Sequence, residues 1–487
     1  MLILAVALCL ASGYLVIGAL WPQHHQSFSD LLLTLPLAAG FGLGIFSVTL
    51  FVVRLLDASH LFAVDASLLV LLLILYLLRR HRPPGVYFLP RRYQDFELPA
   101  WVRGVLAASF AIAAVAALWN AVLRTVAYPH GDGWDAFSIW NLHARFLFLD
   151  RDHWRDGFNA LIPWSHPDYP LLLPAAIAHF WSYLGHDSPM VPAIIGLVFT
   201  FSTVVLLVSS LRQLRGPIAA MLAGLALLTT PLFVEQGTSQ YADIPLSFFI
   251  LASTVLVYFG SRQCPSENPS GPFVLAGLAA GLAAWTKNEG LLFLFASVVA
   301  QFFCFGHQDA SGHGSVNRRC LALFALGTAP VLAVVAWFKH AVATPGDLFS
   351  SPAIMMEKVL TPRRSWVILQ WFAKEFLRFG HWWIIPGTVA MVAFYLLTLH
   401  ERKDGRDPLL QASALALGLT LAGYFAIYLI TPRDLYWHLR FSLNRLFLQL
   451  WPSAVFLFFL FVGGQNSKIE PNSSLNRPSV KKFDSCP

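Results

Sequence analysis

The amino-acid sequence predicts an all-α polytopic membrane protein with about 13 transmembrane helices, plus short or re-entrant segments and interfacial helices in the external loops. Two observations carry this prediction. Of the 487 residues, 57% are hydrophobic and only 12% are charged, whereas about a quarter of a soluble domain is charged. Apolar runs long enough to cross a bilayer also recur along the chain. Because lipid offers no hydrogen bonds and the runs lack period-2 alternation, the spans are expected to be helices rather than barrel strands.

The candidate spans follow one another through short polar connections. Met1 to Leu20 is apolar and has no basic region, which indicates a span rather than a cleaved signal peptide. In chain order the candidates are Leu2–Leu20, Leu31–Val53, Leu61–Leu78, Trp101–Leu123, Leu171–Leu184, Val191–Leu211, Pro217–Val234, Ile244–Phe259, Pro272–Trp285, Gly290–Phe305, Leu321–Ala341, Trp383–Leu399, Leu409–Ile430 and Phe447–Val462.

Basic residues predict which loops face the cytoplasm. The connector Arg79–Arg103 and the tail after residue 463 are rich in Lys and Arg, so both are expected on the cytoplasmic side. Strict alternation between them would leave the tail outside, so one candidate is not a full crossing. Leu171–Leu184 is short and contains Pro174, which favours a re-entrant segment; an incomplete Pro272–Trp285 is the alternative. The first choice places five loops together outside: Tyr128–Pro170, Glu235–Asp243, Lys287–Glu289, Ala343–His381 and Thr431–Arg445.

Composition also narrows the function. The net charge of +7 is explained by loop residues facing anionic lipid, so no nucleic-acid partner is expected. The five cysteines are scattered and the loop histidines lack the spacing of a helical zinc pair, so no disulfide framework or metal site is predicted. The sequence leaves open whether a divalent cation takes part. No phosphate-cradling glycine loop is present, which argues against a nucleotide substrate.

The external loop that begins at Tyr128 is polar, acidic and aromatic between two apolar runs. Asp132 and Asp135 lie directly after a span, and Trp134–Asp150 is expected to form a helix on the membrane surface. Either carboxylate is a candidate general base or metal ligand; helix capping is the alternative role. Further along, His166 and Asp168 are expected to project from a chain that two prolines hold extended, as substrate ligands or as part of a turn entering the bilayer.

Three later clusters are candidate substrate-binding groups. Asp243 begins a span, where an ionisable side chain is a functional candidate and capping the alternative. Lys287 and Glu289 separate two apolar helices; Lys287 is a candidate to neutralise a leaving phosphate while Glu289 holds it in position, and a simple ion pair is the alternative. Arg440 and Arg445 lie among aromatic residues before the last candidate span, where arginine can grip a phosphate or anchor a lipid headgroup.

The order of these motifs resembles the GT-C superfamily of polyprenyl-phosphate-sugar-dependent glycosyltransferases, in the branch of protein O-mannosyltransferases and lipid A glycosyltransferases. The resemblance runs from about Trp101 to Gly290. It implies that Asp135, or Asp132, is the catalytic carboxylate, and that His166 and Lys287 match the family's His-Pro and Lys positions. It further implies four regions: extra N-terminal helices and a basic connector (1–100), a GT-C-like catalytic module (101–305), C-terminal helices (306–462) and a disordered tail (463–487).

The implied reaction moves a sugar from a polyprenyl-phosphate donor to a hydroxyl of a glycan, lipid or protein acceptor. An inverting displacement is expected, by analogy with glycosidases that place acid and base on opposite sides of the sugar. The resemblance implies a bacterial inner membrane with the site facing outward. Two other classes are kept as alternatives: a secondary transporter, which would need ionisable residues at mid-membrane in two related halves, and a non-catalytic component of a glycan-assembly complex.

Overall fold

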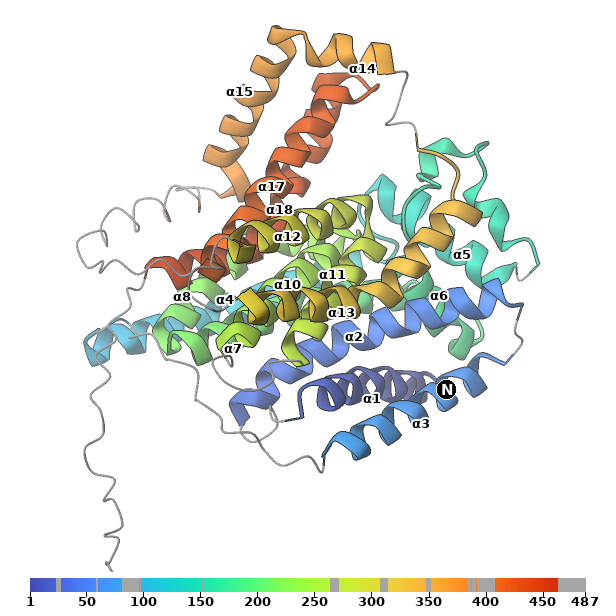
Figure 1. Ribbon diagram of the computed structural model, residues 1–487, viewed down its shortest axis with the longest axis horizontal. Helices are drawn as coiled ribbons and strands as arrows, with labels where there is room; N and C mark the ends of the chain where they lie inside the picture. The colour runs from blue at the N-terminus through green and yellow to red at the C-terminus, as the bar shows by residue number, and fades with distance from the viewer. Residues whose placement is uncertain are drawn as a thin grey trace, which may run out of the picture.

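The computed structural model describes residues 1–22, 28–57, 60–80, 96, 98–150, 152–262, 271–306, 314–346, 352–382, 387, 391 and 408–462. Within these ranges every regular element is a helix, which confirms the predicted all-α class (Figure 1). The tail 463–487 and nearly all of the predicted span Trp383–Leu399 lie outside the described residues.

The helices match most of the predicted apolar runs, with short additional helices in the loops. In chain order they are α1 (Leu2–Leu20), α2 (Phe28–Leu55), α3 (Leu61–Arg80), α4 (Ala100–Ala127), η1 (Ala136–Trp140), α5 (Asn141–Leu149), η2 (Trp154–Phe158), η3 (Pro163–Ser165), α6 (Leu172–Leu184), α7 (Met190–Leu214), α8 (Pro217–Leu228), α9 (Pro231–Thr238), α10 (Asp243–Arg262), α11 (Gly271–Thr286), α12 (Asn288–Gly306), α13 (Gly314–Ala341), α14 (Pro352–Val359), α15 (Pro362–Arg378), η5 (Phe379–His381), α17 (Pro408–Ile430) and α18 (Leu435–Val462).

Nine of the described helices are long and apolar enough to cross a membrane, or ten if the bent pair α8 and α9 forms one span. The helices α6, α11 and α12 are apolar but shorter. The chain is therefore a multi-pass membrane protein, while the count of about 13 crossings stays a prediction. The re-entrant role of α6 also stays a prediction, although its 13 residues fall well short of the roughly 20 that a span needs.

The predicted span Pro217–Val234 corresponds to two helices, α8 and α9, that meet at a bend of 64°, so it stays a prediction as a crossing. Pro231 starts α9, and its ring removes a backbone donor and clashes with a continuing helix. The residue before it, Thr230, is accordingly extended, with φ −81° and ψ 102°. The bend turns α9 toward the end of the bundle where the polar loops meet.

The predicted loop Thr431–Arg445 was wrong, because α18 begins at Leu435 and runs unbroken to Val462. Its first turns carry Arg440 and Arg445 among aromatic residues, so their hydropathy resembles that of a loop although the backbone is helical. These early turns extend the helix beyond its apolar segment. Arg445 is consequently held on a rigid element rather than on a loop.

Helix α2 is central to the bundle and packs against α1, α6 and α7. The Ser47 hydroxyl on α2 donates to the carbonyl of Leu171, and the Trp285 indole donates to the Ser47 oxygen at 2.9 Å. Near the end of α2, Arg54 Nε donates to the carbonyl of Leu147. These bonds attach the N-terminal helices to α5, α6 and α11, which carry or adjoin the loops rich in titratable residues.

A buried polar cluster joins α3 to the bundle. Asp65 is the one residue of α3 that is buried. Its Oδ2 lies 2.9 Å from His179 Nε2 and accepts a hydrogen bond from the Tyr183 hydroxyl at 2.6 Å. The other ring nitrogen of His179 lies 2.8 Å from the carbonyl of Phe46 on α2. The remaining faces of α3 are apolar and largely exposed, as expected for a helix that contacts lipid.

Candidate active site

Charged side chains from four parts of the chain form one connected network. Arg445 on α18 joins two carboxylates: its Nη1 donates to Asp135 Oδ2 at 2.7 Å, and its Nε and Nη2 donate to Asp243 Oδ2 at 2.9 and 2.7 Å. Asp243 Oδ1 in turn lies 3.0 Å from the Lys287 ammonium, which is also 3.0 Å from Glu289 Oε1. Charge-assisted bonds of this length are among the strongest in proteins.

Asp243 lies at the centre of this network. It is fully buried. Besides its bonds with Arg445 and Lys287, it accepts a hydrogen bond from Gln449 Nε2 at 2.6 Å. The Tyr424 hydroxyl on α17 donates to Gln449 Oε1 at 2.8 Å, which fixes the amide so that its NH₂ points at Asp243. Because both carboxylate oxygens bind cations or the amide, Asp243 joins the start of α10 to α18 and to the connection between α11 and α12, and Gln449 extends this contact to α17. A buried carboxylate without such partners would be very costly.

Asp135 is the partly exposed end of the network, with 24% of its side chain accessible. It precedes the π-helical turn η1 and makes no side-chain cap hydrogen bond there, so helix capping does not explain it. Two glycines shape the loop before it. Gly131 has φ +85°, and a Cβ on Gly133 would lie 2.0 Å from the Tyr241 hydroxyl. The Tyr241 ring lies under Arg445, 4.6 Å from the guanidinium carbon.

Lys287 and Glu289 lie where α11 ends and α12 begins. Lys287 is buried between Asp243 and Glu289, while Glu289 is partly accessible. The second oxygen of Glu289, Oε2, is buried without a hydrogen-bond partner. Tyr169 lies beside them, its ring centroid 5.7 Å from the ammonium of Lys287. Burial and the neighbouring Glu289 raise the pKa of Tyr169 well above its ordinary value, so its phenol stays protonated and able to donate.

A second polar group adjoins the network through Asn288. Its amide donates to Asp168 Oδ2 at 2.7 Å, and its carbonyl oxygen accepts a bond from Lys339 at 2.6 Å. Lys339, near the end of α13, also donates to the backbone carbonyl of Asp168. The structure therefore places Asp168 beside Lys287 and Glu289. Lys339 adds a partly exposed cation to this end of the bundle.

The predicted extended chain at His166 was wrong. Residues 163–165 form the short helix η3, and His166 then adopts a left-handed conformation with φ 51°. The following Pro167 disfavours a right-handed helical conformation at His166, so the turn closes in the left-handed region instead. The His166 ring consequently stacks on Tyr169 with 4.6 Å between centroids. His166 thus borders the network through Tyr169.

Two predicted site residues do not join the network. Asp132 forms an ion pair with Arg124 at the end of α4. Arg440 is exposed, and its guanidinium lies over the ring of Phe441. Five residues of α-helix separate it from Arg445, which turns the two side chains about 140° apart. The functional roles of all the predicted site residues stay predictions.

Sequence reasoning missed Gln449, Asn288 and Lys339. Gln449 and Lys339 lie within predicted apolar spans, where a polar side chain must find a partner or face a cavity. That rule could have selected both residues, but it does not identify the partner. Asn288 stands between two residues that were selected, and its part in the site depends on the fold alone.

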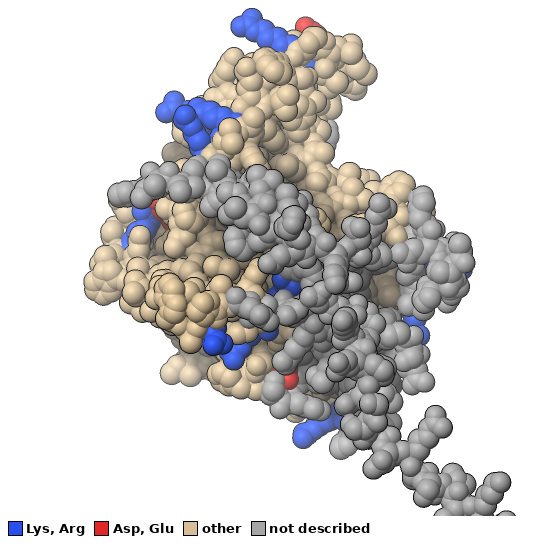
Figure 2. Space-filling view, turned by 90° about the vertical axis from the view of Figure 1, so that its left-hand side faces the viewer, with Lys and Arg blue, Asp and Glu red and all other residues tan. Residues whose placement is uncertain are grey.

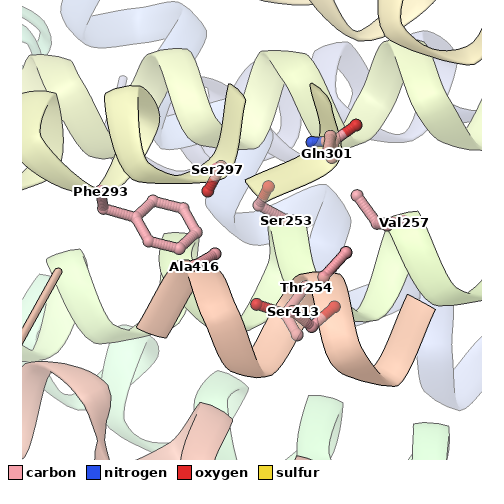
Figure 3. A pocket seen from close by; sticks show the side chains of 9 residues that line it. Ser253, Thr254, Val257, Phe293, Ser297, Gln301, Ser413 and Ala416 are labelled. Carbon is pink, nitrogen blue, oxygen red and sulfur yellow. The ribbon is translucent and has the colours of Figure 1, made fainter. Parts of the chain in front are cut away.

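A small cavity lies deeper in the bundle, between α10, α12 and α17 (Figure 3). Its volume is about 20 Å³, enough for a single water molecule. Ser253 on its wall is ten residues from Asp243, so the cavity lies about 15 Å along α10 from the charged network. Among the described residues, no group of three His, Cys, Asp or Glu side chains is arranged to hold a metal ion.

One ion pair at the edge of the site attaches the segment around His381 to α9, and its strength depends on pH. His381 Nδ1 lies 3.5 Å from Glu235 Oε2 on α9, and this hydrogen bond raises the pKa of His381 above its ordinary value of 6.5. The stabilisation is fully present below pH 6.5 while Glu235 is ionised, and is lost as the pH rises through the raised pKa. Both side chains are partly exposed, so the pair contributes about 1 kcal/mol at most.

We therefore expect the difference in unfolding temperature between the wild-type protein and His381→Gln to be larger at pH 6 than at pH 8.5. Thermal unfolding of the detergent-solubilised protein, followed by tryptophan fluorescence, measures this difference. His340→Gln, which removes a histidine from α13 instead, serves as the control. An equal difference at both pH values would show that the pair does not stabilise the protein through charge.

The helices form a multi-pass membrane bundle. At one end of this bundle they bring together buried ion pairs and partly exposed acids, an arrangement typical of an enzyme's polar site. A family model described as dolichyl-phosphate-mannose-protein mannosyltransferase matches residues 165–337, which confirms the resemblance to the GT-C superfamily. The matched range contains Asp168, Asp243, Lys287 and Glu289; Asp135 and Arg445 lie outside it. No curated protein and no solved structure matches the chain. The family match indicates a membrane glycosyltransferase of the GT-C type.

Proposed function

We propose that the protein transfers a sugar from a polyprenyl-phosphate donor to an acceptor hydroxyl, with inversion at the anomeric carbon. One observation carries the proposal: a partly exposed carboxylate, Asp135, lies at one end of a charged network that also contains the buried Lys287 and the partly buried Arg445. A transferase of this kind needs a base for the acceptor and positive charge for the departing phosphate. The family match adds that such donors are lipid-linked sugars.

In this mechanism the acceptor oxygen attacks the anomeric carbon while Asp135 takes the hydroxyl proton. The new carbon–oxygen bond forms as the bond from that carbon to the phosphate oxygen breaks. The bonding electron pair leaves with the phosphate. Lys287, Lys339 and Arg445 are the cations near enough to this site to stabilise the charge that develops on it. General-base assistance of this kind accelerates reactions about 10²–10⁴-fold.

The three cations differ in how easily a donor phosphate could bind them, because each is already engaged by carboxylates to a different extent. Lys287 is buried between two carboxylates, and Arg445 holds Asp243 with two of its donors but Asp135 with only one. The bond between Arg445 and Asp135 is therefore the easiest to exchange. If a donor phosphate takes that position on Arg445, Asp135 is released and becomes able to accept the acceptor's proton.

The membrane fold suits a lipid donor, because a polyprenyl chain can lie among apolar helices while its sugar reaches the polar loops. We further propose that this end of the bundle faces outward from a bacterial inner membrane, where glycan, lipid or protein acceptors of the cell envelope are found. The basic connector Arg79–Arg103 supports this orientation through the positive-inside rule.

A direct test incubates the purified protein with a panel of polyprenyl-phosphate sugars and measures the polyprenyl phosphate that is released. We expect release with at least one donor, and faster release when an acceptor is added. A transporter or a scaffold would bind such lipids without cleaving them. Absence of release from every donor tested with envelope acceptors present would contradict the proposal.

A further inference from the structure

Helix α15 has three distinct faces, and only one of them packs against other described residues of the protein. The packed face contains Ile368 and Phe372, both buried. Phe372 contacts Phe425 and Tyr428 on α17 and Phe447 on α18, with ring centroids 5.5–6.0 Å apart. Figure 1 shows α14 and α15 projecting from the bundle beside α17. Much of α15 therefore remains uncovered.

The second face is apolar and exposed. Trp366, Leu369, Phe376 and Leu377 are between 47% and 59% accessible. Positions 366, 369, 376 and 377 fall on one stripe at 100° per residue, separate from the packed face. A soluble surface rarely keeps four large apolar side chains in one exposed stripe, so this face is expected to have a partner.

The third face is basic and lies next to the apolar stripe. Arg363, Lys374 and Arg378 are exposed and share one side of the helix. The helix has a single acid, Glu375, which lies on the packed side, where burial raises its pKa. Figure 2 shows Lys and Arg side chains over the same projecting part of the molecule. The fully exposed charged side chains of α15 are therefore all positive, while Glu375 is only partly accessible.

An apolar stripe bordered by a basic stripe is the arrangement of helices that lie in a membrane interface. Helix α18, which α15 contacts, also exposes Tyr436, Trp437 and Phe441 in its first turns, together with Arg440. Aromatic residues of this kind are enriched at the level of lipid headgroups, and basic residues attract anionic ones. Basic side chains outnumber acidic ones on this surface, where Arg363, Lys374, Arg378 and Arg440 are exposed beside the single exposed acid Asp434, so its charge complements anionic lipid.

We propose that α15 binds an anionic lipid surface through its apolar stripe and its basic face. The contacts of Phe372 with Phe447 connect this surface to the part of α18 that carries Arg445, two residues earlier. Arg364 adds a second attachment, donating to the carbonyls of Tyr428 and Thr431. Lipid engagement of α15 thereby holds the turn of α18 that presents Arg445 to the charged network.

The test reconstitutes the full chain in vesicles of phosphatidylcholine with or without phosphatidylglycerol. A nitroxide label is attached to a cysteine at position 369 or 374, after the native cysteines are replaced. Electron paramagnetic resonance then measures collisions with oxygen, which enriches in lipid, and with a nickel chelate, which stays in water. We expect the label at 369 to lose nickel accessibility and gain oxygen accessibility when phosphatidylglycerol is present, and the label at 374 to stay accessible to nickel.

The triple variant Arg363→Gln, Lys374→Gln and Arg378→Gln should abolish the effect of phosphatidylglycerol on the label at 369. A matched control, Arg80→Gln, Arg103→Gln and Arg212→Gln, removes three exposed cations elsewhere and should leave it unchanged. Equal nickel accessibility at 369 in both vesicles would overturn the proposal. Protection from both reagents in detergent as well as in vesicles would overturn it too, and would indicate a protein partner. The measurement does not depend on transfer activity, so it stands or fails separately from the proposed function.

Discussion

Replacing Asp135 with Asn is expected to lower sugar transfer by about 10²–10⁴-fold, the range that general-base assistance supplies. The amide has the shape of the carboxylate but cannot accept the acceptor's proton. It also loses the ion pair with Arg445, whose guanidinium keeps its two bonds to Asp243. Because Asp135 is partly exposed, the variant should fold normally. Initial rates of polyprenyl phosphate release from the purified variant measure the loss.

Asp132→Asn is the matched control for this experiment. The two residues share one loop, but Asp132 binds Arg124 and takes no part in the charged network. We expect the control variant to keep most of the wild-type rate. A large loss in Asp132→Asn together with normal activity in Asp135→Asn would move the base to Asp132.

Replacing Lys287 with Met is expected to destabilise the protein by about 3–5 kcal/mol, the cost of breaking a buried ion pair by removing one partner. The change leaves Asp243, Glu289 and Asp135 with Arg445 as the one cation of the network. Asp243 is fully buried and cannot be solvated where it lies. A lower unfolding temperature and a lower yield of monodisperse protein in detergent are the measurements.

A second substitution tests the electrostatic cause. Glu289→Gln in the Lys287→Met background removes the carboxylate that lost its only ion-pair partner among the described residues. The double variant should recover part of the lost stability, while Glu289→Gln alone should have a smaller effect than Lys287→Met. If the double variant is less stable than Lys287→Met, lost packing rather than unpaired charge explains the result.

The fold class could be predicted from the sequence because hydropathy records which segments lie in lipid. The distribution of charge among the loops also predicted that Asp135, Asp243, Lys287 and Arg445 lie on the same side of the membrane. The structure brings these residues together in one network of ion pairs. Sidedness rules restrict loops to one end of a bundle without giving their distances. The direct pairing of Arg445 with Asp135, 310 positions apart in the chain, could therefore not be predicted.

The remaining misses have separate physical causes. The bend at Pro231 was not predicted, because the apolar run Pro217–Val234 continues through it. The start of α18 was missed because its first turns are rich in arginine and aromatic residues, and hydropathy does not distinguish a helix outside the lipid from a loop. Gln449 was missed because its role depends on Tyr424 and Asp243, which only tertiary packing brings to it.

The contact between Asp65 on α3 and His179 on α6 makes the buried polar cluster depend on residues that precede position 80. The ring nitrogen facing the Phe46 carbonyl must carry hydrogen, since a carbonyl can only accept. The other ring nitrogen lies 2.9 Å from Asp65 Oδ2. A chain starting after residue 80 would lose Asp65 and the Phe46 carbonyl at once, leaving the buried imidazole of His179 without either partner. Helices α2 and α3 thus supply both polar partners of an imidazole that lies on α6.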